Sequence, residues 1–359
     1  MIFNCEPQVS EKDIESVVSC MRKGIASPEH IADVEKKMAS MFGTPCVVVS
    51  SGTSALHLSL MSMGVGPGDE VICPDLTFAA TWNAIEHVGA TPVFADVDSE
   101  TWCINADQVN QMITNKTKAV ISVDLFGNPC DYNSLKKICD ERDLHLILDS
   151  AESLGSKYNN STVLKIGDAA CVSFNLNKIV TSSGGGAVFS ENIDVLNQVK
   201  KIANQSKVGS AYDYDGLGYN YRMPAICAAL LSSQLDDLSK YITRKRQIHD
   251  LYRSKLEDLN VKYPVITQGG ETNYWVPAVL FSSQRARDNV SAALLENKIE
   301  SKLLFTPATL VKWIKSKYNY SENKVSKDIF QRSLILPSSL SLSEVEVDVI
   351  CKTIKSALT

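Results

Sequence analysis

Residues 46–64, CVVVSSGTSALHLSLMSMG, decide the fold class of this chain, because an apolar strand pattern passes directly into a helical one. Residues 46–49 form an apolar and largely β-branched run, and residues 54–64 have the apolar spacing of a helix. Gly52 permits a tight turn between them. Strand and helix patterns alternate in the same way over about the first 190 residues, which predicts an α/β fold with a mostly parallel sheet and helices on both faces.

Seven apolar runs have the length and composition of strands. They are residues 46–49, 70–74, 91–97, 118–125, 144–149, 170–174 and 186–190. From residue 223 the alternation of strand and helix patterns ends. Residues 223–259 have the apolar spacing of a helix throughout, which predicts one or two long helices. We therefore expect a large domain over residues 1–230, followed by the long helix and a smaller α+β domain over residues 231–359.

The composition excludes several classes of protein. The 359 residues are 44% hydrophobic and 21% charged, as in soluble globular proteins, and the formal net charge of −5 offers no basic surface for nucleic acid. No apolar run reaches the length of a membrane span, and the N-terminus lacks the pattern of a signal peptide. Ten scattered cysteines without zinc spacing indicate reduced thiols and no metal site. We expect a cytoplasmic protein with no nucleic-acid or membrane partner.

Candidate functional residues follow the predicted strands, at the edge where open α/β sheets bind ligands. Gly52 and Thr53 begin a helix whose free N–H groups suit a phosphate, although a plain N-cap also explains them. Asp149 ends a buried strand, where it either has a charged partner or caps a helix. Phe78 is either a core residue or a ring that stacks on a planar ligand. Lys178, before a glycine-rich turn, is either a solvated lysine or a nucleophilic amine.

Other ligand-binding patterns fit poorly. No Gly-Lys-Ser/Thr follows the glycines at 184–186, and no G-x-G-x-x-G follows the first strand. None of the histidines pairs with a candidate serine nucleophile, so a structural role is expected for His30, His57, His87, His145 and His249. The candidate residues together match the needs of pyridoxal 5'-phosphate (PLP). This cofactor requires an anion site such as a helix start, an aromatic ring, a carboxylate and a lysine.

Five blocks of sequence, in the same order along the chain, resemble the sugar aminotransferases of the DegT family. They are SSGTSALHLSLMSMGVGPGDEVICPDLTFAATWNAI (50–85), GATPVFADVDSETW (89–102), LILDSAESLGS (146–156), SFNLNKIVTSSGGGAV (173–188) and GLGYNYRMPAICAAL (216–230). The resemblance covers nearly the whole chain. It implies the aspartate-aminotransferase architecture, which is fold type I of the PLP enzymes.

The resemblance implies roles for residues around the reacting atoms. Lys178 would form the Schiff base with PLP, Asp149 would face the pyridine nitrogen, and Phe78 would stack on the cofactor ring. Glu152 would lie near the cofactor, at a position where the family has glutamine, histidine or glutamate. Some relatives carry a histidine in place of the lysine and dehydrate sugars, so the presence of Lys178 favours transamination.

The resemblance also implies a phosphate site and a partner. Gly52, Thr53 and Ser173 would hold the cofactor phosphate. Asn220 resembles an asparagine that reaches the phosphate of the neighbouring subunit's cofactor, which implies a homodimer with shared active sites. One departure is Gly184, where the family usually has a glutamate.

For the reaction, the resemblance implies L-glutamate as amino donor and the C4 ketone of a nucleotide-linked 4-keto-6-deoxy sugar as acceptor, in the synthesis of a bacterial surface glycan such as O-antigen. The stretch NKIVTSSGGG (177–186) is close to the branch that acts on UDP-2-acetamido-2,6-dideoxy-4-ulose, so a UDP-sugar is expected. The GDP-perosamine synthase branch is the next most similar. Amination at C3, a GDP- or dTDP-linked sugar, and a non-catalytic PLP-binding regulator are the alternatives.

Overall fold

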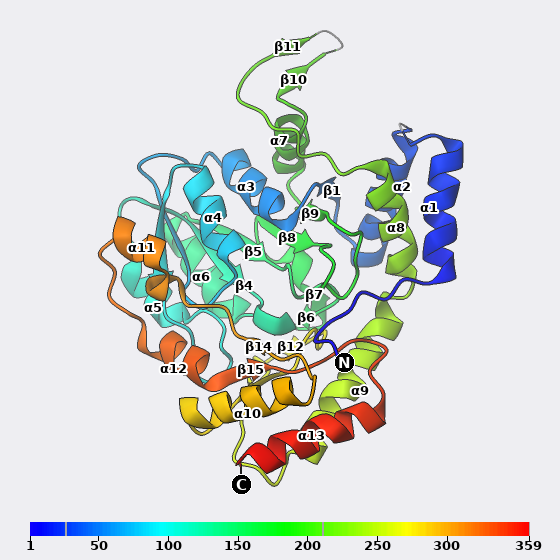
Figure 1. Ribbon diagram of the computed structural model, residues 1–359. Helices are drawn as coiled ribbons and strands as arrows, with labels where there is room; N and C mark the ends of the chain where they lie inside the picture. Colours follow the sequence, from blue (N-terminus) through cyan, green and yellow to red (C-terminus); the bar gives the residue numbers. More distant parts are fainter. Residues whose placement is uncertain (26, 210–211, 359) are drawn as a thin grey trace.

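The structure is a computed structural model that describes residues 1–25, 27–209 and 212–358 (Figure 1). Its centre is a seven-stranded sheet. In spatial order the strands are β1 (Cys46–Val49), β9 (Gly186–Phe189), β8 (Ala169–Ser173), β5 (His145–Asp149), β4 (Thr117–Val123), β2 (Glu70–Pro74) and β3 (Thr91–Ala95). Strand β9 is antiparallel to both neighbours, and all other pairs are parallel. The seven predicted strands are these seven, and the predicted α/β class is confirmed.

Helices cover both faces of the sheet because alternate strand residues are apolar on both sides. Val47 and Val49 of β1 pack in one buried cluster, and Cys46 and Val48 pack in another. The helices of the first cluster are α3 (Gly52–Ser62), α4 (Ala79–His87) and α7 (Ile193–Ala203). Those of the second are α2 (Glu29–Phe42), α5 (Ala106–Met112), α6 (Tyr132–Arg142) and α8 (Ala225–Asp236). Helix α1 (Glu11–Lys23) packs against α8.

The C-terminal third forms a smaller unit with its own buried cluster at the lower end of the molecule in Figure 1. Its elements are α9 (Leu238–Lys255), β13 (Ala278–Leu280), α10 (Gln284–Glu296), β14 (Lys302–Leu303), α12 (Lys324–Arg332), β15 (Ser333–Ile335) and α13 (Glu344–Leu358). Helix α11 (Lys312–Lys317) lies beside α4 instead, where Ile314 joins the first cluster and Trp313 stacks on Trp82. The long helical pattern after residue 223 is two helices, α8 and α9, which meet at Asp237. Ile2 pairs with Ile299, so the first residues lie against this unit. The domain boundary at residue 230 stays a prediction.

Short elements connect these layers. They are η1 (Leu125–Gly127), η2 (Val163–Lys165), η3 (Ala308–Leu310), β6 (Lys157–Tyr158), β7 (Ser161–Thr162) and β12 (Gly270–Glu271). A hairpin of β10 (Lys207–Val208) and β11 (Asp213–Tyr214) projects from the body beyond α7 (Figure 1). In the part of the chain that the structure describes, no helix is both long and apolar enough to cross a bilayer.

The parallel register places the carboxyl ends of β2, β3, β4, β5 and β8 at one edge of the sheet. Helix α3 begins directly after β1 and reaches the same edge, because β1 runs antiparallel to β9 and β9 antiparallel to β8. The turns at this edge carry most of the polar residues that the sequence singles out.

Candidate active site

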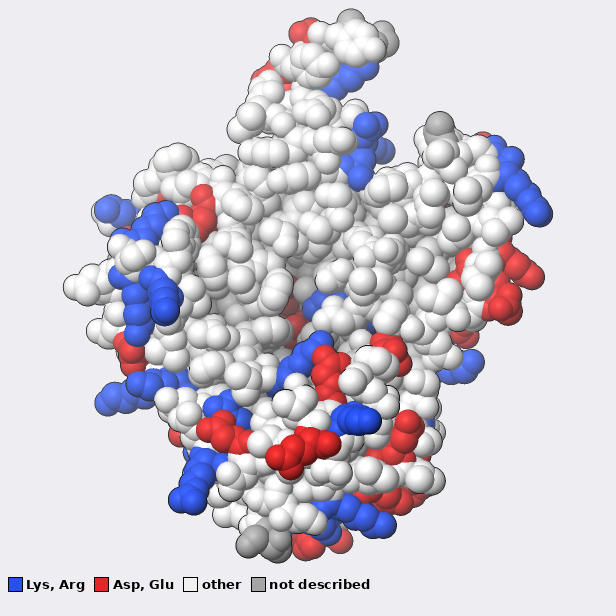
Figure 2. Space-filling model, in the orientation of Figure 1, with Lys and Arg blue, Asp and Glu red and all other residues white. Residues whose placement is uncertain are grey.

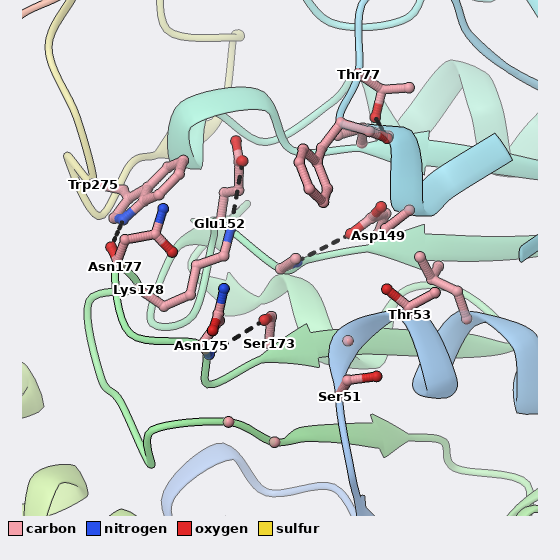
Figure 3. A pocket seen from close by; sticks show the side chains of 18 of the residues that line it. Ser51, Thr53, Thr77, Asp149, Glu152, Ser173, Asn175, Asn177, Lys178 and Trp275 are labelled. Carbon is pink, nitrogen blue, oxygen red and sulfur yellow. Dashed lines mark hydrogen bonds and ion pairs between the residues drawn. The ribbon is translucent and has the colours of Figure 1, made fainter. Parts of the chain in front are cut away.

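A cavity of about 290 Å³ lies at this edge, between the ends of β5 and β8 and the start of α3 (Figure 3). Seven of the eight predicted site residues line it, and these are Gly52, Thr53, Phe78, Asp149, Glu152, Ser173 and Lys178. Asn220 does not line it. The structure also adds residues that the sequence did not single out, among them Ser51, Asn175, Asn177, Trp275 and Phe305.

The start of α3 forms an anion-binding corner of this cavity. Ser51 caps the helix, and its hydroxyl accepts a hydrogen bond from the Ser54 amide at 3.0 Å. The cap therefore occupies the third amide, while the amides of Gly52 and Thr53 have no acceptor within the helix. A Cβ atom on Gly52 would lie 2.8 Å from Ser173 Cβ, so only glycine lets the turn approach the end of β8 this closely. Two free amides at a helix N-terminus suit a phosphate.

Asp149 is a buried carboxylate at the end of β5. Its Oδ2 accepts a hydrogen bond from Thr81 Oγ1 at 2.8 Å, and its Oδ1 accepts one from the Ala151 amide at 3.3 Å. Burial raises the pKa of Asp149, and the Thr81 hydrogen bond and the charge of Lys178 oppose this shift. A carboxylate held this way is stabilised by a cationic ligand in the cavity, such as a protonated ring nitrogen.

Lys178 reaches into the cavity from the loop after β8, and its side chain is only 13% exposed. Its Nζ lies 3.5 Å from Glu152 Oε1 and 4.2 Å from the centroid of the Trp275 ring (Figure 3). The Trp275 indole N–H donates to the Asn177 carbonyl at 2.8 Å, which fixes the backbone next to the lysine. The lysine is therefore a positioned amine inside a cavity, and the surface-turn interpretation does not describe it.

Glu152 is the second buried carboxylate. Its Oε2 accepts a hydrogen bond from the Phe126 amide at 2.8 Å. Burial raises the pKa of Glu152, and the charge of Lys178 opposes the shift. The two carboxylates thus share one cation, Lys178, which is the only positively charged side chain among the described residues that line the cavity.

A third buried carboxylate braces the turn that carries the other two. Asp124 accepts hydrogen bonds from Ser150 Oγ at 3.2 Å and from Ser153 Oγ at 2.6 Å, one on either side of Glu152. The Tyr132 hydroxyl also donates to it. Burial raises the pKa of Asp124 to about 6. This bracing keeps the turn after β5 in one conformation.

Two phenylalanine rings, those of Phe78 and Phe305, form part of the cavity wall. Phe78 lies at the N-terminus of α4 with its side chain more than half exposed, and its ring centroid is 5.5 Å from that of Phe305. The ring of Phe305 also lies 6.0 Å from that of Phe126. A planar ligand between Lys178 and this wall would contact an aromatic face.

The residues present fit PLP. The cofactor needs donors for a phosphate, a carboxylate for its ring nitrogen, an amine for its aldehyde and a ring against its face. The start of α3, Asp149, Lys178 and Phe78 supply these four groups around one cavity, and Gly52 leaves room for the anion-binding turn. Fold and site together define the class of the protein, a fold type I enzyme that uses PLP.

Comparison with known proteins gives the family. The DegT/DnrJ/EryC1/StrS aminotransferase family matches residues 7–355, and the chain belongs to it. The chain is 35% identical to GDP-perosamine synthase of Escherichia coli O157:H7, over 97% of this chain and 96% of the relative. It is 31% identical to the UDP-N-acetyl-3-dehydro-alpha-D-glucosamine 3-aminotransferase of Acidithiobacillus ferrooxidans, over 90% and 88%. The PLP form of the sugar aminotransferase Spr1654 from Streptococcus pneumoniae superposes with a TM-score of 0.93 at 29% identity, over 99% and 98%.

These findings confirm the predicted family, the fold type and the cofactor. The chain is a PLP-dependent sugar aminotransferase by family. The roles of individual residues stay predictions. Trp275 and Phe305 were missed because each looks like an ordinary core residue in its own segment. Thr81 had a usable signal, since it lies one helical turn after Phe78 and therefore on the same side of α4.

Proposed function

We propose that this protein transfers the amino group of L-glutamate to the ketone of a nucleotide-linked 4-keto-6-deoxy sugar. The observation that carries the proposal is the amine of Lys178, held between Glu152 and Trp275 in the same cavity as the buried Asp149. A lysine and a strand-end carboxylate on one cofactor site are the groups that transamination requires.

The proposal assigns each residue a task. The amides of Gly52 and Thr53, with Ser173, would hold the cofactor phosphate, and Phe78 would lie against the ring. When bound, the cofactor supplies an electron sink for the carbon that loses its proton. Asp149 would hold a proton on the ring nitrogen, since a buried carboxylate favours a cation beside it.

Proton movement falls to Lys178. Its Nζ would accept a proton from the substrate carbon and return one to the neighbouring position, as a general base and then a general acid. Glu152 Oε1, at 3.5 Å, holds that amine in the cavity, and the Trp275 ring limits its movement on the other side. The walls of the cavity leave the Lys178 side chain only 13% exposed, which limits the access of bulk water to the proton transfer.

For the nucleotide, three relatives favour a GDP-linked sugar over the UDP-sugar expected from residues 177–186, while two others are named for UDP-linked sugars. Three GDP-perosamine synthases are 35%, 34% and 30% identical to this chain. Perosamine carries its amino group at C4. We therefore propose amination at C4 with a GDP-linked sugar as first substrate to test and the UDP-linked sugar as second.

A second candidate function is amination at C3. It is favoured by the 31% identity to a UDP-N-acetyl-3-dehydro-alpha-D-glucosamine 3-aminotransferase. The position of the new C–N bond in the product, determined by NMR, distinguishes the two.

We also propose that the active protein is a homodimer in which Asn220 serves the partner's site. Asn220 is exposed and lies outside the cavity of its own chain. The hairpin just before it projects from the body, and its Tyr212 is 90% exposed. Figure 2 shows that the face over α3 and α4, up to the base of this hairpin, is largely free of charged side chains, as suits a protein interface.

Mixing two inactive variants tests the shared site. If Asn220 acts across the dimer, a mixed dimer of Lys178→Ala and Asn220→Ala contains one site with both residues native. Random mixing should then restore about a quarter of wild-type activity, since half of the dimers are mixed and each has one working site. No recovery in dimers shown by native mass spectrometry to have exchanged subunits would place Asn220 in its own site.

The reaction itself is tested with purified protein, PLP, L-glutamate and GDP-, UDP- and dTDP-linked 4-keto-6-deoxy sugars, together with a UDP-linked 3-keto sugar. The proposal predicts release of 2-oxoglutarate that depends on one keto-sugar, with one amino sugar formed per 2-oxoglutarate. Binding of PLP without release of 2-oxoglutarate on any keto-sugar would favour the non-catalytic regulator.

A further inference from the structure

Four adjacent parallel strands of the sheet end in a buried aspartate. Asp75 follows β2, Asp96 follows β3, Asp124 follows β4, and Asp149 ends β5. Only Asp149 lines the cavity. Asp124 braces the turn after β5, which leaves Asp75 and Asp96 without a task in the chemistry described above.

Asp75 joins the sheet to a segment from the C-terminal unit. Its Oδ1 accepts a hydrogen bond from the Thr309 amide at 2.7 Å, and its Oδ2 accepts one from Thr309 Oγ1 at 2.9 Å. The carbonyl of Asp75 accepts a third, from the Ala308 amide at 2.8 Å. Asp75 and Thr309 are both almost fully buried, so these bonds are shielded from water.

The segment held in this way carries Phe305, four residues before Thr309, and Phe305 lines the cavity. Pro307 lies between them and reduces the freedom of the connection. The ring of Phe305 contacts those of Phe78 and Phe126 and has neither charge nor hydrogen-bonding group. Its contribution to binding is therefore contact with an apolar surface of the ligand.

We propose that Asp75 is a positioning residue that, through Thr309, holds Phe305 as the wall against which the sugar ring of the keto substrate packs. The proposal rests on the proposed function. A sugar ring offers C–H faces that pack on an aromatic ring, whereas glutamate is a short diacid recognised through its charges. If the hydrogen bonds between Asp75 and Thr309 are removed, Phe305 is no longer held in place. Binding of the keto-sugar therefore weakens, and the reaction with glutamate stays unchanged.

The first variants are Asp75→Asn and Thr309→Val. An asparagine turns one acceptor into a donor that faces a donor of Thr309, and the valine removes only the hydroxyl donor. The two half-reactions are followed separately by the visible absorbance of the cofactor, one with glutamate and one with the keto-sugar. For Asp75→Asn we expect the KM for the keto-sugar to rise about tenfold or more, with the glutamate half-reaction within about twofold of wild type. Thr309→Val should shift the same KM in the same direction by a smaller factor.

Asp96→Asn is the matched control. Asp96 accepts hydrogen bonds from the amides of Val325 and Ser326 at 2.9 and 2.8 Å, and from Ser326 Oγ at 2.6 Å. It thus fastens the same C-terminal unit to the next strand, but α12, which it holds, contributes no residue to the cavity lining. Asp96→Asn should lower the thermal stability of the protein. It should leave both the rate of the glutamate half-reaction and the KM for the keto-sugar as in wild type.

Two results would overturn the proposal and leave Asp75 a structural residue. One is an Asp75→Asn variant that impairs the glutamate half-reaction as much as the keto-sugar half-reaction. The other is an Asp96→Asn variant that, like Asp75→Asn, raises only the KM for the keto-sugar. If Asp75→Asn fails to fold, Thr309→Val decides, and an unchanged keto-sugar KM in that variant overturns the proposal. A wild-type protein that reacts with glutamate but with no keto-sugar would instead overturn the proposed function, and this inference with it.

Discussion

The replacement Gly186→Ala should weaken PLP binding, because Gly186 packs against the main chain of the phosphate-binding turn. Gly186 begins β9 and pairs with Val49 of β1. A Cβ atom there would lie 2.4 Å from the Ser51 carbonyl oxygen and 2.8 Å from the Gly52 nitrogen. Ordinary contact begins at 3.4 Å, and neither atom belongs to a flexible side chain. The turn must therefore move by about 1 Å.

A movement of this size removes a hydrogen bond. An N–H donor near 2.9 Å from a phosphate oxygen lies outside bonding range after a further displacement of about 1 Å. A hydrogen bond to a charged acceptor contributes about 1.5–3 kcal/mol. The loss of one bond, from the amide of Gly52 or Thr53, therefore predicts a PLP affinity lower by roughly 10- to 150-fold.

The assay is titration of the apo protein with PLP, followed by visible absorbance. Gly184→Ala is the matched control, because Gly184 lines the same cavity and nothing lies within 4 Å of its Cβ position. We expect wild-type affinity for Gly184→Ala. Wild-type affinity in Gly186→Ala, or an equal loss in both variants, would refute the placement of the phosphate at the start of α3.

Three further variants test other parts of the account. Lys178→Ala should abolish release of 2-oxoglutarate while the thermal melting curve stays that of a folded protein, and normal turnover would remove the lysine from the mechanism. Asp149→Asn should lower kcat by about 100-fold or more, yet leave the apo protein as stable or more stable, since burial raises the pKa of Asp149 and its charge is costly without the cofactor. Burial raises the pKa of Asp124 from 3.8 to about 6. The stability gained from protonated Asp124 is therefore complete below about pH 4 and is lost as the pH rises through 6. Urea unfolding should therefore show the free energy of unfolding of wild type falling by up to about 3 kcal/mol over this range relative to Asp124→Asn, and parallel pH profiles would contradict the shift.

The strands could be predicted from the sequence because helices cover both faces of the sheet. Such strands are continuous apolar runs, as in residues 46–49 and 70–74, and glycine or polar residues mark where they end. Their order in space could not be predicted. Gly186–Phe189 reads like the other runs, yet it lies antiparallel between β1 and β8. Local pattern gives the existence of a strand, whereas its neighbours depend on the whole chain.

The site was predictable where it is built from residues that directly follow strands, as with Asp149 and Lys178. Trp275 and Phe305 come from segments about 100 residues or more further along the chain and reach the cavity only through tertiary packing. The aspartates show a second limit. Asp75 and Asp124 have the same strand-end signal as Asp149, so that pattern alone does not distinguish them. The family resemblance singled out Asp149, and the structure shows that of the three only Asp149 lines the cavity.

The most direct test of the central claim is the visible absorption spectrum of the purified protein with PLP, before and after excess L-glutamate. The account predicts a yellow band from the cofactor joined to Lys178, absent in Lys178→Ala, that disappears with glutamate as the band of the aminated cofactor grows. A lysine-dependent band that does not respond to glutamate would contradict glutamate as the amino donor. No band at any PLP concentration would contradict the assignment of Lys178 to the cofactor.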